Sequence, residues 1–193
     1  MLVLYFAPGS SSMAPHIALH ESGLPFEGRP VSFARRQQRS PGFLAWNPAG
    51  KVPVLLVDGR PLTEVAGILY FIAKAAPQRE LWPRDLDAQA QVVSWMSFNA
   101  SVLHPGRQEG PDQAYRVYGI ADRRLGDRKW AVGDSHTIAD IHLFRLYWRM
   151  RHAMQPPPDA FPSLEAHYRR TMARLAVQQT LAAEQAVGYE LPN

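Results

Sequence analysis

Residues 50–64 read GKVPVLLVDGRPLTE. An apolar run of strand length opens at Pro53, and an Asp-Gly pair at 58–59 separates it from a second short run. Such a pair between hydrophobic runs is typical of a two-residue turn with positive φ, so residues 54–57 and 60–63 are predicted to form a β-hairpin. A helical spacing of apolar residues begins after the final glutamate, which predicts that a helix follows the hairpin.

The two ends of this hairpin are suited to bind a small peptide. A proline at the first position of a strand cannot donate a hydrogen bond to the sheet, so the main-chain amide and carbonyl of Val52 are expected to stay free. The helix start at Glu64 offers N–H groups for a ligand carboxylate, and the Glu64 side chain suits an ammonium group. Together, the N–H groups and the Glu64 carboxylate would recognise an amino-acid head group. These residues alone leave open a simpler alternative, in which Pro53 only ends a loop and Glu64 only caps its helix.

The composition limits the chemistry of the chain. It has 193 residues, 46% of them hydrophobic, which is enough to bury a full core, and it has no cysteine. Disulfides, thiolate metal sites and a protein thiol nucleophile are therefore excluded. The net charge of +4 comes from basic residues spread along the sequence, which argues against nucleic acid as a partner. The basic group at residues 35–39 would either attract a small acidic ligand or form a solvated loop.

The N-terminal residues 2–6 are apolar and lack a basic region before them, so they predict a buried strand and not a signal peptide. No apolar run reaches the ~18 residues that a membrane span requires. We expect a soluble, cytoplasmic protein without a membrane partner.

Alternating strand and helix patterns predict the α/β order βαβαββα for residues 1–76. The polar, proline-bearing residues 77–86 are interpreted as a linker. Residues 87–193 have helical spacing, strong helix formers and no convincing strand, which predicts an all-helical second domain. Within it, Thr137 and Asp140 have the spacing of a capping box at a helix start.

Five motifs follow one another along nearly the whole chain, at residues 5–19, 21–27, 47–53, 133–140 and 161–164. In this order they resemble the cytosolic glutathione S-transferase family, and the first looks like the opening of its bacterial, beta-type members. The resemblance implies a thioredoxin-like first domain that binds glutathione as a co-substrate, a helical second domain, and a homodimer that acts in detoxification.

The resemblance also implies roles for individual residues. The Val52–Pro53 bond would be cis, and the main chain of Val52 would pair with the cysteinyl backbone of glutathione. Glu64 and the residue after it would hold the γ-glutamyl end. Lys51 and Arg35 stand where family members often reach the glycine carboxylate or nearby polar groups.

Three departures from the family pattern bear on activity. Ser11 stands where beta-type enzymes have a cysteine, so a mixed disulfide between this residue and glutathione cannot form. Val65 replaces the usual Ser or Thr after the acidic residue, which keeps an N–H donor and loses a hydroxyl contact worth ~1 kcal/mol. The stretch between His104 and Gly133 is shorter than in the family, which would reshape the pocket of the second substrate.

The thiol of glutathione resembles free cysteine, with a pKa of ~8.5, and must be mostly thiolate near neutral pH to attack an electrophile. Lowering that pKa by two units requires ~2.7 kcal/mol, which hydroxyl donors and the positive end of a helix can supply. Ser11 is the leading donor, followed by Ser10 and Tyr5. The alternatives are that the serines only cap the helix and that Tyr5 only packs in the core. His104 would be an acid, a base, a polar wall or only a structural residue, and no metal is expected.

The leading hypothesis is a glutathione transferase that conjugates the glutathione thiolate to a small hydrophobic electrophile. Two rivals stay open. One is a non-catalytic glutathione-binding or protein-interaction module on the same scaffold. The other is a glutathione-dependent disulfide reductase, in which two glutathiones react in turn.

Overall fold

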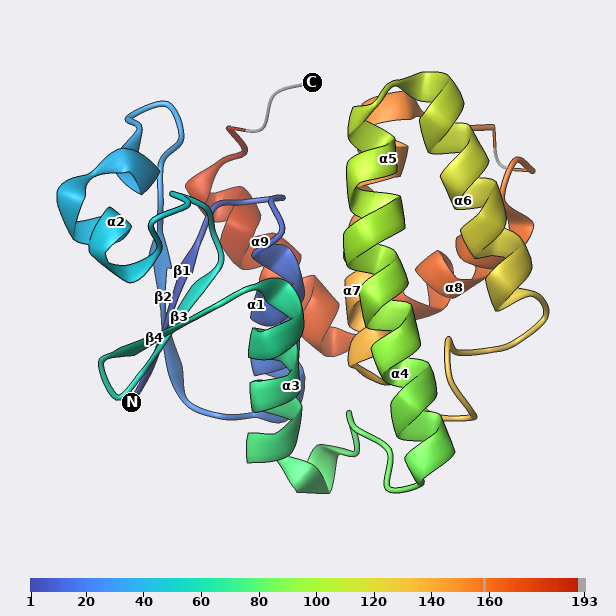
Figure 1. The fold of residues 1–193 in the computed structure, drawn as a ribbon, viewed down its shortest axis with the longest axis horizontal. Coiled ribbons are helices and arrows are strands. Elements are labelled where there is room, and N and C mark those ends of the chain that lie inside the picture. Colours follow the sequence, from blue (N-terminus) through green and yellow to red (C-terminus); the bar gives the residue numbers. More distant parts are fainter. Residues whose placement is uncertain (158, 191–193) are drawn as a thin grey trace. The chain divides into compact units, whose positions relative to one another are not determined.

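The computed structural model describes residues 1–157 and 159–190, and their contacts group them into two compact units (Figure 1). The first unit joins Met1–Arg79 to the segment that begins at Leu175, and the second is Glu80–Arg174. None of the helices in the described ranges is both long and apolar enough to cross a membrane.

The C-terminal helix α9, Leu175–Val187, packs against α1, Met13–Ser22, and so belongs by its contacts to the first unit. The expected division into domains at 1–76 and 87–193 with a linker between them stays a prediction. Four of the residues in that second range, 158 and 191–193, lie outside the described residues.

The first unit is built on a four-stranded mixed sheet with the strand order β2-β1-β3-β4. β1 pairs in parallel with β2 and antiparallel with β3, and β3 pairs antiparallel with β4. This is the thioredoxin-like order βαβαββα, as predicted. Besides α1, its elements are β1 (Leu2–Phe6), β2 (Phe26–Pro30), η1 (Gln37–Arg39), α2 (Pro41–Trp46), β3 (Val54–Val57), β4 (Arg60–Thr63), α3 (Val65–Ala75) and η2 (Pro77–Arg79).

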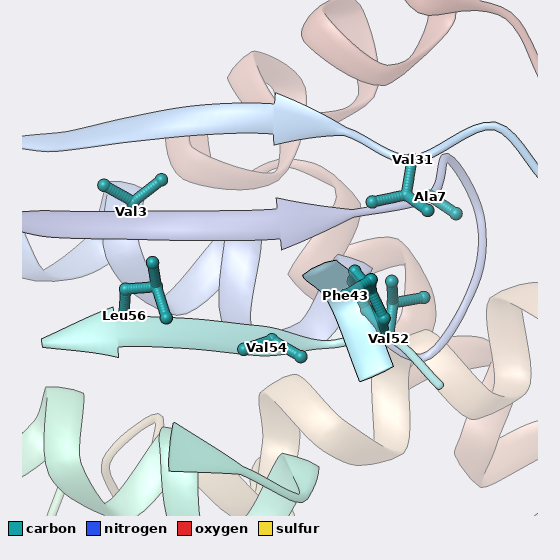
Figure 2. Packing of buried hydrophobic residues seen from close by; sticks show 7 residues of the cluster. All are labelled: Val3, Ala7, Val31, Phe43, Val52, Val54 and Leu56. Atoms are coloured by element: carbon teal, nitrogen blue, oxygen red, sulfur yellow. The ribbon is translucent and has the colours of Figure 1, made fainter. Parts of the chain in front are cut away.

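The two faces of the sheet carry different side chains, because successive residues of a strand point to opposite faces. Val3 and Tyr5 of β1 lie on the face that α2 covers, and Phe6 points to the opposite face, where its ring contacts His16 of α1. Figure 2 shows the buried cluster on the α2 side, which extends from the strands to the loop before β3. The cluster consists of Val3, Ala7, Val31, Phe43, Val52, Val54 and Leu56.

The predicted hairpin is confirmed at both strands. Val57 pairs with Arg60 across the turn, and the two turn residues Asp58 and Gly59 have φ of 49° and 80°. Positive φ at both positions matches the Asp-Gly preference of a primed hairpin turn. Local turn chemistry therefore places the end of β4 just before α3, with Glu64 as the one residue between them.

The described part of the second unit is all-helical, as predicted. α7 is its central helix, since every residue from Ile138 to Met150 is buried. The elements are α4 (Leu86–Phe98), the π-helical turn η3 (Asn99–Leu103), α5 (His104–Gln108), α6 (Pro111–Leu125), α7 (Ile138–Met154) and α8 (Pro162–Met172).

The predicted capping box at the start of α7 is confirmed and is part of a larger buried network. Asp140 accepts hydrogen bonds from the amide and hydroxyl of Thr137 at 2.8 and 3.0 Å. Its other oxygen accepts from the Ala131 amide at 2.7 Å and lies 3.0 Å from Nε2 of His167. The carboxylate therefore joins the helix start to the preceding loop and to α8.

Candidate functional site

Two buried serines shape the loop that precedes α1. The Ser12 hydroxyl accepts a hydrogen bond from the Ala7 amide at 3.0 Å and donates one to the Ala7 carbonyl at 3.1 Å. The Ser10 hydroxyl lies 2.8 Å from that of Ser12, and both side chains are buried. Ser12 is also the N-cap residue of α1, but its side chain makes no capping bond to the helix. These hydroxyl groups therefore stabilise the loop itself.

Ser11 lies between these two residues and differs from both. Its side chain is partly exposed, and within residues 1–157 and 159–190 its hydroxyl has no hydrogen-bond partner. It immediately precedes the N-cap of α1, close to the helix end that favours negative charge. The fold therefore leaves the hydroxyl of the leading predicted donor available to a ligand.

The loop before β3 presents its main chain. β3 begins at Val54, and the part of the chain that the structure describes offers no hydrogen-bond partner to the amide or carbonyl of Val52. The Val52–Pro53 bond is cis, as the resemblance implies. The Asn47 amide group stabilises the loop by donating to the Lys51 carbonyl at 2.7 Å, and the Lys51 side chain is exposed.

Glu64 precedes α3 in an uncommon backbone conformation, with φ of 66° and ψ of 128°. A positive φ in a residue other than glycine costs of the order of 1–3 kcal/mol and persists only where the surrounding structure enforces it. Glu64 is the N-cap residue of α3, but its exposed carboxylate makes no capping hydrogen bond to the helix. Val65 follows as the first residue of the helix, where main-chain N–H groups lack helical partners.

Tyr5 packs with the cluster on the α2 side of the sheet. Its ring packs against Trp46 and Phe43, with centroid separations of 4.6 and 6.2 Å. Its hydroxyl accepts a hydrogen bond from Nη1 of Arg29 at 3.0 Å. This geometry agrees with the alternative in which Tyr5 is a packed strand residue.

Arg35 is exposed and lines a cavity of about 280 Å³ together with Pro8 and Ser32. The Glu190 carboxylate enters the same place, where it accepts hydrogen bonds from the Ser32 hydroxyl at 2.9 Å and from the Ala34 amide at 3.0 Å. The hydrogen bond from the Ala34 amide is the main reason that the pKa of Glu190 lies below its ordinary value. Residues 32–35 therefore have the donors that hold a carboxylate.

His104 lies in the second unit, as the first residue of α5. Its Nε2 lies 3.5 Å from the side-chain nitrogen of Gln108, and its ring is partly buried. The structure thus brings Ser10 and Ser11 together on one loop of the first unit and places His104 in the other unit. Nowhere in the described ranges do three or more His, Cys, Asp or Glu side chains gather to hold a metal ion.

Sequence reasoning missed one buried pair beside the serine loop. Glu184 of α9 accepts a hydrogen bond from the Gly9 amide at 2.7 Å, and its second oxygen lies 3.1 Å from Nδ1 of His16. Gly9 and Glu184 are 175 positions apart, and no local pattern marks either as a partner of the other. Only the packing of α9 on α1 brings them together.

Two family models match the chain. The N-terminal domain of glutathione S-transferase matches residues 10–75, and the C-terminal domain of glutathione S-transferase matches residues 100–174. Among curated relatives, glutathione S-transferase GST-4.5 of Xanthomonas campestris is 34% identical over 94% of this chain and 98% of its own length. The glutathione S-transferase GstA of Escherichia coli is 30% identical over the same shares of the two chains.

Solved structures agree with these matches. A sphingomonad glutathione S-transferase complexed with glutathione has a TM-score of 0.85 and 31% identity, over 95% of this chain and 98% of that chain. A bacterial beta-class glutathione S-transferase of Sphingomonas chungbukensis has a TM-score of 0.82 and 34% identity, over 94% and 98% of the two chains.

Proposed function

Because the chain belongs to the glutathione S-transferase family, we propose that it conjugates the thiolate of glutathione to a small hydrophobic electrophile. The active form is a homodimer in the cytoplasm, and its role is detoxification. Membership of the family supports this assignment, and the residues of the first unit provide its chemistry.

The observation that carries the proposal is the main chain of Val52, whose amide and carbonyl lack partners among the described residues beside the cis bond to Pro53. An extended peptide can pair with such a segment as an added strand, which gives affinity through main-chain hydrogen bonds. The cysteinyl backbone of glutathione pairs with Val52 in this way. Its side chain then carries the sulfur away from the paired backbone.

The two ends of the tripeptide meet groups of matching charge. The ammonium group of the γ-glutamyl residue binds the exposed Glu64 carboxylate. The carboxylate of the same γ-glutamyl residue binds the N–H groups at the start of α3, including that of Val65. The glycine carboxylate binds Lys51 and Arg35. The hydrogen bonds that the Glu190 carboxylate accepts from Ser32 and Ala34 support this role of the Arg35 loop, because neighbouring donors of the same loop bind a carboxylate.

Ser11 activates the thiol. Its hydroxyl donates a hydrogen bond to the sulfur, and the nearby start of α1 stabilises the negative charge of the thiolate. A decrease of two units in the thiol pKa corresponds to ~2.7 kcal/mol, which one charge-assisted bond and a helix end can provide together. Because the chain has no cysteine, the sulfur of glutathione is the only thiol nucleophile in the reaction that we propose. Ser10 supports the loop, and the role of His104 as acid, base or polar wall stays a prediction.

The test is a titration of the protein with glutathione by calorimetry, followed by ultraviolet absorbance of the bound thiolate across pH. Binding with a lowered thiol pKa supports a transferase, and binding without that change supports the non-catalytic module. No binding contradicts both. Ser11→Ala is expected to raise the thiol pKa and lower turnover. Ser101→Ala is the matched control, because the exposed Ser101 hydroxyl donates to the Ser97 carbonyl at the end of α4. An unchanged thiol pKa in Ser11→Ala would show that another residue contacts the sulfur.

A further inference from the structure

The buried carboxylate of Glu184 reaches from α9 to both ends of the segment that carries the serines. One oxygen accepts from the Gly9 amide at 2.7 Å, before the serines, and the other lies 3.1 Å from Nδ1 of His16, inside α1. The Glu184 side chain is completely buried, and that of His16 is 4% exposed. The carboxylate therefore links the loop to the helix that follows it.

A carboxylate is costly to bury unless hydrogen bonds replace its water. Both oxygens of Glu184 have such a partner, and both partners belong to the segment between Gly9 and His16. Gly9 itself has φ of 72°, a left-handed conformation that side chains other than glycine rarely adopt. The loop thus turns sharply at the residue that the carboxylate holds.

The imidazole of His16 is held in turn by its neighbours. Its ring lies 4.7 Å from that of Phe6, 5.8 Å from that of Phe26, and 5.2 Å from the stacked ring of His20. A ring fixed on several sides directs its Nδ1 at the carboxylate with little freedom to turn away. The position of Glu184 is consequently set by α1 as well as by α9.

We propose that Glu184 is a positioning residue for the loop that activates the thiol, an inference that rests on the proposed function. It acts through Gly9 and so fixes the position of Ser11 relative to the start of α1. Ser11 has no hydrogen bond of its own to hold it within the described residues, so its place depends on the loop on either side. A misplacement of about 1 Å in such a group can lower a rate by about 10²-fold.

The experiment compares three variants of the full chain. Glu184→Ala removes both contacts, and Glu184→Gln keeps the shape and an oxygen that can accept from the Gly9 amide. Thr180→Val is the matched control, because Thr180 is equally buried on α9 and its hydroxyl donates to the Ala176 carbonyl of the same helix. The readouts are hydrogen exchange of the Gly9 amide, the thiolate absorbance of bound glutathione at neutral pH, and kcat against KM.

In Glu184→Ala we expect the Gly9 amide to exchange about 10- to 100-fold faster, the range for losing a bond to a charged acceptor. We also expect kcat to fall by about 10²-fold, with a smaller thiolate signal and a nearly unchanged KM for glutathione. Glu184→Gln should lie between Glu184→Ala and the wild type in all three readouts, and Thr180→Val should match the wild type.

The proposal is overturned if Gly9 exchanges no faster in Glu184→Ala than in Thr180→Val, or if exchange rises while kcat and the thiolate signal stay at wild-type values. Should Glu184→Ala fail to fold, the comparison of Glu184→Gln with Thr180→Val decides, and equal Gly9 exchange in the two overturns it. Failure of the proposed function looks different. In that case the wild type does not bind glutathione, whatever the exchange rate of Gly9.

Discussion

Replacing the carboxylate of Asp140 by an amide should destabilise the protein more than any surface change. The Asp140 side chain is completely buried and accepts from three donors on Thr137 and Ala131, with Nε2 of His167 as its fourth neighbour. In Asp140→Asn one oxygen becomes an NH₂ group that faces donors on one side, and the partner of His167 loses its charge. We therefore expect the bonds on that side to be lost.

Hydrogen bonds to a charged group are worth about 1.5–3 kcal/mol each, so losing the bonds on one side of the buried carboxylate should cost about 3–5 kcal/mol. Since each kcal/mol lowers Tm by about 2–4 °C in a chain of this size, the decrease should be about 6–20 °C. Thr137→Ala, which removes only a cap hydroxyl, should cost ~1 kcal/mol. The ratio of the two effects distinguishes a network centred on the carboxylate from an ordinary helix cap.

The effect of Asp140 should also depend on pH. Although burial alone would raise the pKa of Asp140, its hydrogen bond with His167, the nearby imidazoles of His167 and His136, and the hydrogen bond from the Ala131 amide hold that pKa below the ordinary value of 3.8. A carboxyl whose pKa is lower in the folded state stabilises the fold above its unfolded pKa. That contribution is lost as pH falls through the folded value, so the wild type and Asp140→Asn should converge in strong acid.

Guanidinium unfolding followed by helical circular dichroism measures these differences. Asp134→Asn is the matched control, because Asp134 is an exposed carboxylate in the loop that precedes α7, and this variant should unfold with the wild type. If Asp140→Asn is within about 1 kcal/mol of the wild type at neutral pH, the typical worth of a single neutral hydrogen bond, the reasoning about the buried pair is refuted.

Three further changes test other parts of the structure. Burial, with smaller effects of Arg145 and His104, lowers the pKa of His142 to about 3. As pH falls below 6.5, His142 therefore becomes protonated in the unfolded chain but stays neutral in the folded protein. Linkage then predicts a loss of about 2 kcal/mol between pH 8 and pH 5, and this part of the pH dependence should be absent in His142→Gln. Val65→Ser should tighten glutathione binding by ~1 kcal/mol, about fivefold in Kd by calorimetry, and an unchanged Kd would show that the added hydroxyl meets no ligand group. Gly106→Ala would place a methyl group 2.9 Å from the Val117 side chain and should cost about 1–3 kcal/mol in thermal unfolding, whereas stability equal to the wild type would mean that this contact relaxes freely.

The parts of the fold that could be predicted depend on short stretches of sequence. The hairpin follows from the Asp58-Gly59 turn, and the capping box follows from the spacing of Thr137 and Asp140. Each is set by a few neighbouring residues whose local preference agrees with the tertiary structure. The βαβαββα order follows in the same way from alternating local patterns.

Features that join distant segments could not be predicted in this way. His167 lies 27 positions from Asp140, and Glu184 lies 168 positions from His16, so neither pair has a sequence signature. The π-helical turn that starts at Asn99 was also missed, because it follows α4 without an intervening residue and no local pattern marks the change in hydrogen bonding. The helix that starts at His104 was not predicted separately, because proline in a first turn is compatible with a helix and gives no boundary signal.

The packing of α9 on α1 affects how the polypeptide can be divided for study. A fragment that stops after residue 79 would lack α9, whose residues Ala176, Val177 and Glu184 are buried. It would therefore expose the surface of α1 that α9 covers. Such a fragment is expected to aggregate even though its sheet is complete. A usable truncation would instead remove Glu80–Arg174 and join the remaining ends with a flexible linker, since the first unit uses both ends of the chain.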